Sequence, residues 1–306
     1  MIPAAGRHGG DGPAVARALG LDPASVLDLS ASLNPAAPDV TVLAARHLAS
    51  LRHYPDHRDA ARLLATAIGV APEQLVLTSG GSEAIALVAA ELGGHVLAEP
   101  EFALHPRGDA GPVWRSDPHN PTGLLASPSE HAEVWDEAFY PLATGRWSAH
   151  RAGVVVGSLT KVFACPGLRL GYILADDAHH LAQRQPHWPI NSLAVALLPE
   201  LLELAALPAW SATIATARDA LVALLARHRI PTDPSDAPWV LARAPGLRDG
   251  LAPFGIVVRD CTSFGLPDHV RIAVPDDIGL GRLDDALQRI VPGHPASVAT
   301  PGRAAP

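Results

Sequence analysis

Apolar and polar residues follow two different periods along this chain, and the periods alternate. Between residues 57 and 68 the apolar positions Leu63, Leu64, Ala67 and Ile68 recur at helical spacing, whereas 154–157 is a short apolar run typical of a buried strand. The pattern predicts helices at 14–19, 40–50, 57–68, 80–92, 193–227 (with interruptions near Pro199 and Pro208), 247–253 and 281–290. It predicts strands at 74–78, 95–98, 154–157, 169–174, 239–242, 256–259 and 270–273.

The order of these elements indicates the fold class. Strands that alternate with helices indicate an α/β fold with a mostly parallel sheet, and the last third of the chain indicates a smaller α+β region. The 306 residues are enough for a large core and about two domains. Residues 291–306 are rich in Pro, Ala and Gly without apolar periodicity, so we expect a disordered tail.

Composition and charge exclude several classes of protein. Hydrophobic residues make up 48% of the chain and charged residues 18%, and a net charge of −8 gives no reason to expect a nucleic-acid partner. The N-terminus lacks the apolar segment of a signal peptide, and no run of apolar residues is long enough to predict a membrane span. With only Cys165 and Cys261, a disulfide framework is excluded and a cytoplasmic location is expected. We expect Cys165 to be a packing residue, since nothing nearby in sequence activates it.

Residues 158–172 carry the strongest chemical signal. Lys161 follows an apolar run and lies between Ser158 and Arg169. Desolvation and a neighbouring positive charge both disfavour the ammonium form of a lysine, and a neutral amine can form a Schiff base with an aldehyde. Ser158 and Arg169 supply a hydroxyl and a fork of donors that suit a phosphate. Aldehyde and phosphate together indicate pyridoxal 5′-phosphate (PLP), although a Ser-x-x-Lys motif alone is common and most lysines are solvated surface charges.

Other segments could complete such a site. Gly80, Gly81 and Ser82 form a turn between a predicted strand and a predicted helix, where backbone N–H groups and the helix dipole can bind an anion. Asp136 is expected at the carboxyl end of a strand, where α/β proteins bind ligands. Arg271 lies within an apolar strand and needs an anionic partner if it is buried. The ordinary alternatives are a plain turn, a surface carboxylate and an exposed arginine on an edge strand.

Residues 158–172 as a whole, with Pro-Gly-Leu-Arg-x-Gly-Tyr after the lysine motif, resemble the lysine segment of fold-type I PLP-dependent enzymes. The resemblance is to the branch that contains histidinol-phosphate aminotransferase and threonine-phosphate decarboxylase, and it runs from about residue 8 to residue 290. It implies a homodimer with a large cofactor domain and a small C-terminal domain. It implies that PLP is held by Lys161, with its phosphate bound by Gly80, Gly81, Ser82, Ser158 and Arg169.

The resemblance also implies roles around the cofactor ring. Phe102 would stack on the ring face, Asn120 would contact the phenolic oxygen, and Asp136 would pair with the pyridinium nitrogen. Tyr54 would reach the cofactor phosphate of the neighbouring subunit. Family members often have a tyrosine three residues after the aspartate, where this chain has Phe139.

Three segments are similar to threonine-phosphate decarboxylases of the cobalamin pathway in particular. They are His8-Gly9-Gly10-Asp11 together with 28–35, then 188–194, and 259–266. The similarity implies that His8, Asn34 and Arg259 line the phosphate end of a phosphorylated amino-acid substrate, and that Arg271 binds its carboxylate. We therefore expect decarboxylation of L-threonine O-3-phosphate to (R)-1-aminopropan-2-yl phosphate. The alternative is transamination of histidinol phosphate or a related amino acid.

Two spacings differ from this family. Asn120 lies 39 residues after Gly81 and Asp136 lies 16 residues after Asn120, and both intervals are short. We therefore expect an N-terminal arm and substrate-binding segment at 1–35, a shortened large PLP-binding domain at 36–190, and a small C-terminal domain at 191–290. The shortening leaves open a third alternative, a degenerate and non-catalytic family member.

Overall fold

The structure, a computed structural model, describes residues 2–290, so the predicted disorder of 291–306 lies outside the described residues. Its α-helices are α1 (Gly12–Leu19), α2 (Val40–Ala45), α3 (Arg58–Ile68), α4 (Gly81–Leu92), α5 (Tyr140–Thr144), α6 (Leu159–Val162), α7 (Ala178–Ala182), α8 (Ser192–Glu203), α9 (Leu207–Arg227), α10 (Leu247–Leu251) and α11 (Asp277–Arg289). Its strands are β1 (Leu27–Leu29), β2 (Leu75–Thr78), β3 (His95–Val96), β4 (Val113–Ser116), β5 (Val134–Asp136), β6 (Val154–Gly157), β7 (Gly171–Leu174), β8 (Trp239–Arg243), β9 (Ile256–Asp260) and β10 (His269–Ala273).

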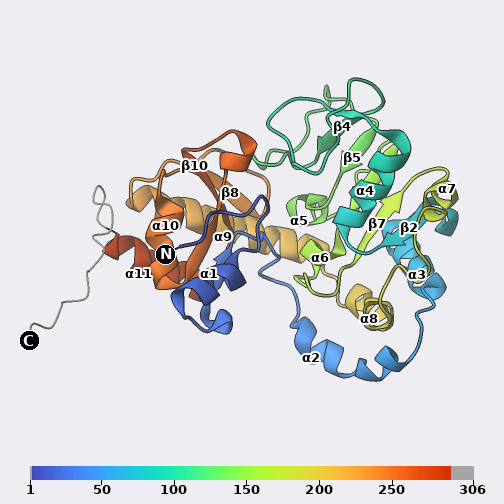
Figure 1. The fold of residues 1–306 in the computed structure, drawn as a ribbon, viewed down its shortest axis with the longest axis horizontal. Coiled ribbons are helices and arrows are strands. Elements are labelled where there is room, and N and C mark those ends of the chain that lie inside the picture. The colour runs from blue at the N-terminus through green and yellow to red at the C-terminus, as the bar shows by residue number, and fades with distance from the viewer. Residues whose placement is uncertain (1, 291–306) are drawn as a thin grey trace, which may run out of the picture.

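The larger sheet has six strands in the order β2-β7-β6-β5-β4-β3 (Figure 1). Strands β3 to β6 run parallel, and β7 is antiparallel to both of its neighbours. Successive side chains of a strand face opposite sides of a sheet. Accordingly Leu75, Leu77 and Trp135 pack with α3, α6 and α8, whereas Val76 and Val134 pack with α4 and α7 on the other face. The predicted α/β fold with a mostly parallel sheet is confirmed.

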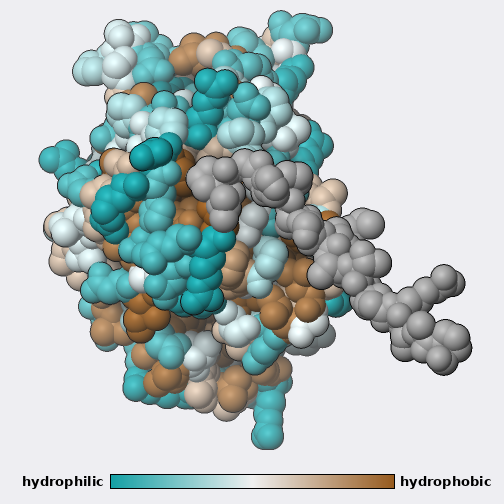
Figure 2. Space-filling view, turned by 90° about the vertical axis from the view of Figure 1, so that its left-hand side faces the viewer, coloured by the Kyte–Doolittle hydropathy of each residue, from teal (hydrophilic) through white to brown (hydrophobic). Residues whose placement is uncertain are grey.

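The smaller sheet has the order β1-β9-β10-β8, and its strand β1 was not predicted. Strand β1 pairs in parallel with β9, so the N-terminal segment joins the C-terminal strands. Val258, Val270 and Ile272 face α9, α10 and α11 and form the core of this smaller lobe. Seen from this end of the molecule, hydrophilic and hydrophobic residues are interspersed on the surface (Figure 2).

The predicted interruption near Pro199 is wrong, whereas the one near Pro208 is confirmed. Helix α8 runs through Pro199, and the chain breaks at 204–206 instead. Pro208 lies in the first turn of α9, where a missing N–H costs no hydrogen bond. Leu201 of α8 and Trp210 of α9 are buried in the core of the larger lobe, although the sequence placed 191 at the start of the small domain.

The sequence between Gly81 and Asp136, whose spacings are short for the family, contains strand β4. Between β3 and β5 it contains no helix. Residues 97–112 connect β3 to β4 and residues 117–133 connect β4 to β5, all within the described part of the chain and without a helix in either connection. Parallel strands are usually joined through a helix. Here the connections run as loops beside β4 and β5 (Figure 1). The predicted strand at 95–98 is shorter than expected, since β3 ends at Val96.

Helix α9 joins the two lobes. Its length and composition would also allow it to cross a membrane, the only helix among residues 2–290 for which this holds. Leu207 and Trp210 are buried in the larger core, and Leu221 and Leu224 are buried in the smaller one. Between them, Ile214 packs with residues of both lobes, so the apolar residues of α9 are those of a helix that belongs to two cores.

We expect Leu201→Ala to lower the free energy of unfolding by about 2–5 kcal/mol, because the truncated side chain leaves a cavity in the larger core. Leu204, one turn later and 45% exposed, provides the control. Leu204→Ala should cost about 1 kcal/mol or less. Urea denaturation of the two variants checks this, and equal losses would contradict the packing of α8 described above.

Candidate active site

The predicted site residues meet where the parallel strands end. Asp136 is the last residue of β5, Ser158 follows β6, and Asn120 lies in the loop after β4. Gly80 lies between β2 and α4. In open α/β sheets ligands bind at the carboxyl ends of strands, so the topology gathers residues that are far apart in sequence.

Lys161 lies on α6, a short helix that the sequence did not predict and that begins directly after β6. Its Nζ donates to the Ala31 carbonyl oxygen at 2.9 Å and lies 5.6 Å from the centre of the Phe139 ring. Burial, followed by the charges of Arg271 and Arg169, lowers the pKa of Lys161 to about 8. Lys161 is also the only lysine in the sequence, a signal that the motif analysis did not use.

The turn before α4 has the geometry that the predicted phosphate site requires. Gly80 has a φ of +79°, a conformation that glycine adopts without strain. The Arg169 guanidinium lies against this turn, with one terminal nitrogen 3.5 Å from both the Ser79 carbonyl oxygen and the Ser82 hydroxyl. A Cβ atom at Gly80 would lie 2.5 Å from that guanidinium, and one at Gly81 would lie 3.3 Å from the Ser158 Cβ. The glycines therefore leave room for Arg169 and Ser158 beside the free N–H groups of α4.

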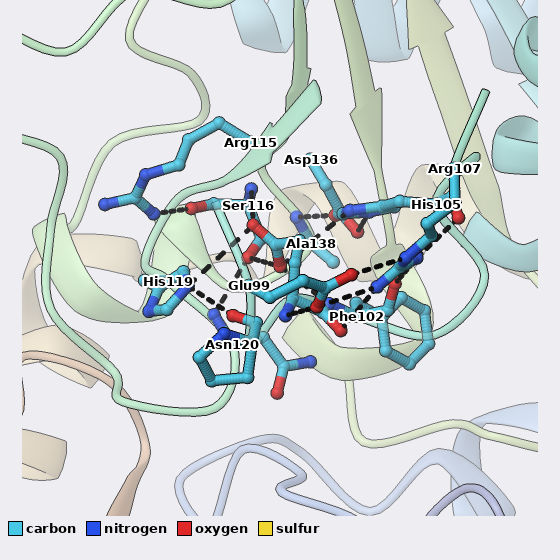
Figure 3. Close-up of polar contacts among 12 residues, drawn as sticks. Glu99, Phe102, His105, Arg107, Arg115, Ser116, His119, Asn120, Asp136 and Ala138 are labelled. Atoms are coloured by element: carbon cyan, nitrogen blue, oxygen red, sulfur yellow. Dashed lines mark hydrogen bonds and ion pairs between the residues drawn. The ribbon is translucent and has the colours of Figure 1, made fainter. Parts of the chain in front are cut away.

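Asp136 is buried and has a partner that the sequence analysis missed. His105 Nε2 lies 3.0 Å from an Asp136 carboxylate oxygen, and the Ala138 backbone N–H donates to the other oxygen (Figure 3). The ring centres of His105 and Phe102 are 5.6 Å apart. His105 lies in the loop between β3 and β4, where no spacing or motif distinguishes it from an ordinary loop histidine. Only the fold brings it to Asp136.

Two arginines face each other across the smaller sheet. Arg271 of β10 and Arg259 of β9 are directly opposite in the strand register, and both are buried. The exposed edge-strand alternative is therefore wrong. Arg271 donates to the Asn120 side-chain oxygen at 2.6 Å, and the Nε atoms of both arginines have no hydrogen-bond partner among the described residues. Burial lowers the pKa of Arg271 to about 10, and it also lowers the pKa of Arg259. Two buried cations side by side require an anion.

The N-terminal segment contacts one of these two arginines, Arg259. Arg259 donates to the backbone carbonyls of Gly6 and Arg7. These contacts bring His8 to the site, where its ring centre lies 5.6 Å from that of Phe102 in an edge-on arrangement. Burial lowers the pKa of His8, with Arg259 as the next cause.

The two N-terminal motifs hold each other. The Gly10 N–H donates to the Ser30 hydroxyl at 2.8 Å, and the Gly12 N–H donates to the Asp28 carboxylate at 2.9 Å. A Cβ atom at Gly9 would lie 2.0 Å from the Ser30 carbonyl oxygen, so only glycine fits there. The residue after Ser30 is Ala31, whose carbonyl accepts from Lys161, so the motifs connect the N-terminal segment to the lysine.

Three residues named in the sequence analysis have other surroundings than the residues around Lys161: one is hydrogen-bonded to backbone groups, one is exposed and one is buried in the core. The Asn34 side chain donates to the Val162 carbonyl at 2.8 Å and accepts from Ala36, so it holds α6 in place and does not extend toward Arg259. Tyr54 is 78% exposed and stacks on Trp188 at 4.4 Å between ring centres. Cys165 is buried, which raises the pKa of its thiol to about 12, in agreement with a packing role.

Residues 103–290 match the family model for aminotransferase class I and II, which is more than half of the chain. The chain belongs to this family, and it is a PLP-dependent enzyme of fold type I. Its residues fit that cofactor: one partly buried lysine, a glycine turn that admits Arg169, a buried carboxylate and two arginines with unpartnered nitrogens. This set of residues favours a PLP-dependent enzyme over a degenerate, non-catalytic family member.

Named relatives cover most of the chain. A histidinol-phosphate aminotransferase of Halorubrum lacusprofundi is 28% identical in an alignment of 339 positions that covers 89% of this chain and 92% of the relative. That alignment is longer than this chain, so the relative has segments that this chain lacks.

Solved structures share the fold. A histidinol-phosphate aminotransferase of Sinorhizobium meliloti in complex with pyridoxal-5′-phosphate has a TM-score of 0.79 at 17% identity, over 95% of each chain. An L-threonine-O-3-phosphate decarboxylase of Porphyromonas gingivalis has a TM-score of 0.72 at 22% identity, over 86% of this chain and 99% of the other.

We expect the titration of Lys161 to raise the free energy of unfolding of the cofactor-free protein between pH 8 and pH 10. The pKa of Lys161 is about 8 when folded and near 10.5 when unfolded, so the unfolded chain binds more protons in this window and stability rises with pH. Lys161→Met removes this term and should be more stable than the native protein at pH 7 by on the order of 1–3 kcal/mol. The difference should shrink at pH 10, and urea denaturation at both pH values measures it. An equal difference at both would contradict the lowered pKa.

Proposed function

We propose that the protein is a PLP-dependent aminotransferase for an amino compound with a phosphate group, of the histidinol-phosphate type. The observation that carries the proposal is the cross-strand pair Arg259 and Arg271. Both are buried, neither has a carboxylate partner within the described residues, and Arg271 contacts Asn120 of the larger lobe. The names of the relatives that align over most of the chain support the same reaction type.

The proposed roles follow from position and charge. Lys161 would hold the cofactor, and the turn at Gly80–Ser82 with Arg169 would bind its phosphate. Asp136 would face the pyridine nitrogen, with Phe102 against the ring. When bound, PLP supplies an electron sink for negative charge at the substrate α-carbon. Lys161, whose lowered pKa leaves part of the amine neutral near pH 8, would move the proton at that carbon.

The arginines would bind the anionic groups of the substrates. Arg271 lies nearer the cofactor ligands through its hydrogen bond to Asn120, so it would bind the carboxylate of the amino donor. Arg259 lies one strand further out, under the N-terminal segment, and would bind a phosphate or a second carboxylate. Its present partners are two backbone carbonyls and the Ser263 hydroxyl, and an anion can replace the carbonyls.

Decarboxylation of threonine phosphate is the second candidate, and a specific observation favours it. The His8-Gly9-Gly10-Asp11 motif is held by Asp28 and Ser30, and it places His8 against Phe102. This arrangement is built by the segments that resemble threonine-phosphate decarboxylases. The Porphyromonas gingivalis neighbour of that name shares the fold. L-threonine O-3-phosphate has a carboxylate and a phosphate, so it also suits two arginines.

A homodimer is part of the proposal. Tyr54 is largely exposed on the outer surface together with Trp188, on which it stacks, and with Leu51 and Leu48 of the preceding 3-10 helix. In a dimer this surface would be covered and Tyr54 could reach the partner's cofactor phosphate, as the family resemblance implies. Sedimentation of the native protein tests this assembly.

Reduction with borohydride in the presence of PLP should attach the cofactor to Lys161. Because Lys161 is the only lysine, the α-amino group of the first residue is the one competing amine. Peptide mass spectrometry should find the modified peptide in the native protein and no cofactor on that peptide in Lys161→Ala. Native protein that is colourless with PLP and takes up none would contradict the proposed site.

The native enzyme should transfer an amino group between histidinol phosphate and 2-oxoglutarate, measured as glutamate formed. Arg259→Gln should raise the KM for the phosphorylated substrate about 10–100-fold, since a charge-assisted contact is worth about 1.5–3 kcal/mol. Arg259 would contact the phosphate and not the reacting atoms, so its replacement should change kcat less than KM.

The control is Arg243→Gln, an exposed arginine of the same lobe that pairs with Asp268 on the surface. This variant should keep the native KM. A parallel assay follows CO₂ release from L-threonine O-3-phosphate. Release of CO₂ without glutamate formation would reject the aminotransferase and select the decarboxylase.

A further inference from the structure

One buried carboxylate, Glu101, is not used by the functions above. It lies in the loop between β3 and β4, directly before Phe102, and it is 3% exposed. Among the described residues its ion-pair contacts are two histidines, His105 at 3.8 Å and His119 at 4.0 Å, and no arginine. A carboxylate without an arginine or lysine partner is costly to bury. Its retention in the interior therefore calls for a role that a neutral residue would not fill.

The carboxylate oxygens of Glu101 accept three hydrogen bonds, one from the loop itself and two from Ser116 of β4. One oxygen accepts from the Phe102 backbone N–H at 2.8 Å and from the Ser116 hydroxyl at 2.5 Å. The other accepts from the Ser116 backbone N–H at 3.0 Å. Ser116 is the last residue of β4. Glu101 therefore attaches the loop at 97–112 to β4 by side-chain hydrogen bonds, in a connection where parallel strands usually have a helix.

Ser116 passes the connection on to Asn120. The Asn120 backbone N–H donates to the Ser116 hydroxyl at 2.8 Å (Figure 3), and the Asn120 side-chain oxygen accepts from Arg271. On the other side of Glu101, His105 Nδ1 lies 3.8 Å from this carboxylate, with no hydrogen-bond partner among the described residues, and His105 Nε2 lies 3.0 Å from the Asp136 carboxylate. Glu101 thus contacts Phe102 directly, and it is linked to Asn120 through Ser116 and to Asp136 through the nearby His105.

The backbone of the same loop is held from outside by Arg107. Its guanidinium donates to the carbonyls of Glu101 at 2.9 Å and of Phe102 at 2.8 Å, and it pairs with Glu99. Arg107 therefore restrains the loop on its solvent side. Glu101 is what fixes the loop to β4 on its inner side, where the cofactor ligands lie.

We propose that Glu101 is a positioning residue for the cofactor. Its carboxylate replaces the helical connection that residues 97–112 lack, and it sets Phe102, Asn120 and the His105–Asp136 contact relative to one another. The proposal rests on the assignment of Phe102, Asn120 and Asp136 to PLP, and it holds for either reaction considered above.

Glu101→Gln tests the proposal, because glutamine keeps the shape and turns one acceptor oxygen into a donor that faces a backbone N–H or the Ser116 hydroxyl. We expect PLP to bind about tenfold more weakly, by absorbance titration of the cofactor-free protein. The visible circular dichroism of bound cofactor, which reports the orientation of the ring, should fall at saturating PLP. Glu73→Gln, an exposed glutamate, is the matched control and should change neither.

A double-mutant cycle tests whether Glu101 acts on PLP binding through Ser116. If Glu101 acts through Ser116, Ser116→Ala should weaken PLP binding, and the double variant should lose less affinity than the two single losses added together. Additive losses would overturn the assigned pathway. Native dissociation constant and native circular dichroism in Glu101→Gln, with only a lower melting temperature, would overturn the positioning role. Failure of the native protein itself to bind PLP would instead reject the proposed function.

Discussion

Cations without carboxylate partners at the junction of the two lobes are the constraint on which the rest of this structure depends. Lys161 and Arg169 come from the larger lobe and Arg259 and Arg271 from the smaller one, and within residues 2–290 none forms an ion pair. Their charges are satisfied in part by carbonyls and by the Asn120 amide. Such a cluster costs stability in the isolated chain, and anionic ligands offset the cost. The family's cofactor and a phosphorylated or dicarboxylic substrate carry the charges that this cluster lacks.

The two connections beside β4, near one edge of the larger sheet, carry the predicted site residues Phe102 and Asn120. Strands β2, β5 and β6, which precede other predicted cofactor residues, are covered by helices on both faces of the sheet. Among the described residues, the connections beside β4 lack such helices. There, side-chain hydrogen bonds from Glu101 and Arg107 hold a loop that helical packing would otherwise hold.

Much of the fold was predictable because its elements have strong local signals. Helix α3 has an amphipathic pattern and ends at Gly69 in the left-handed conformation, and both features are visible in sequence. Strand β1 and helix α6 are short and were missed, since three or four residues do not establish a period. Strand β4 contains Arg115, and a charge in a four-residue strand hides its apolar pattern.

The sequence by itself indicated the cofactor chemistry, because the residue types around Lys161 and in the glycine turn suit PLP, and the resemblance of residues 158–172 to PLP-dependent enzymes implied the roles of Asn120 and Asp136. Only the tertiary structure decided which other groups share the site. His105 and Glu101 have no motif, and their role arises from a loop that folds back on β4. Arg259 and Arg271 were visible as residues of apolar strands. Their burial and direct opposition depend on strand register, which long-range pairing sets and local sequence does not encode.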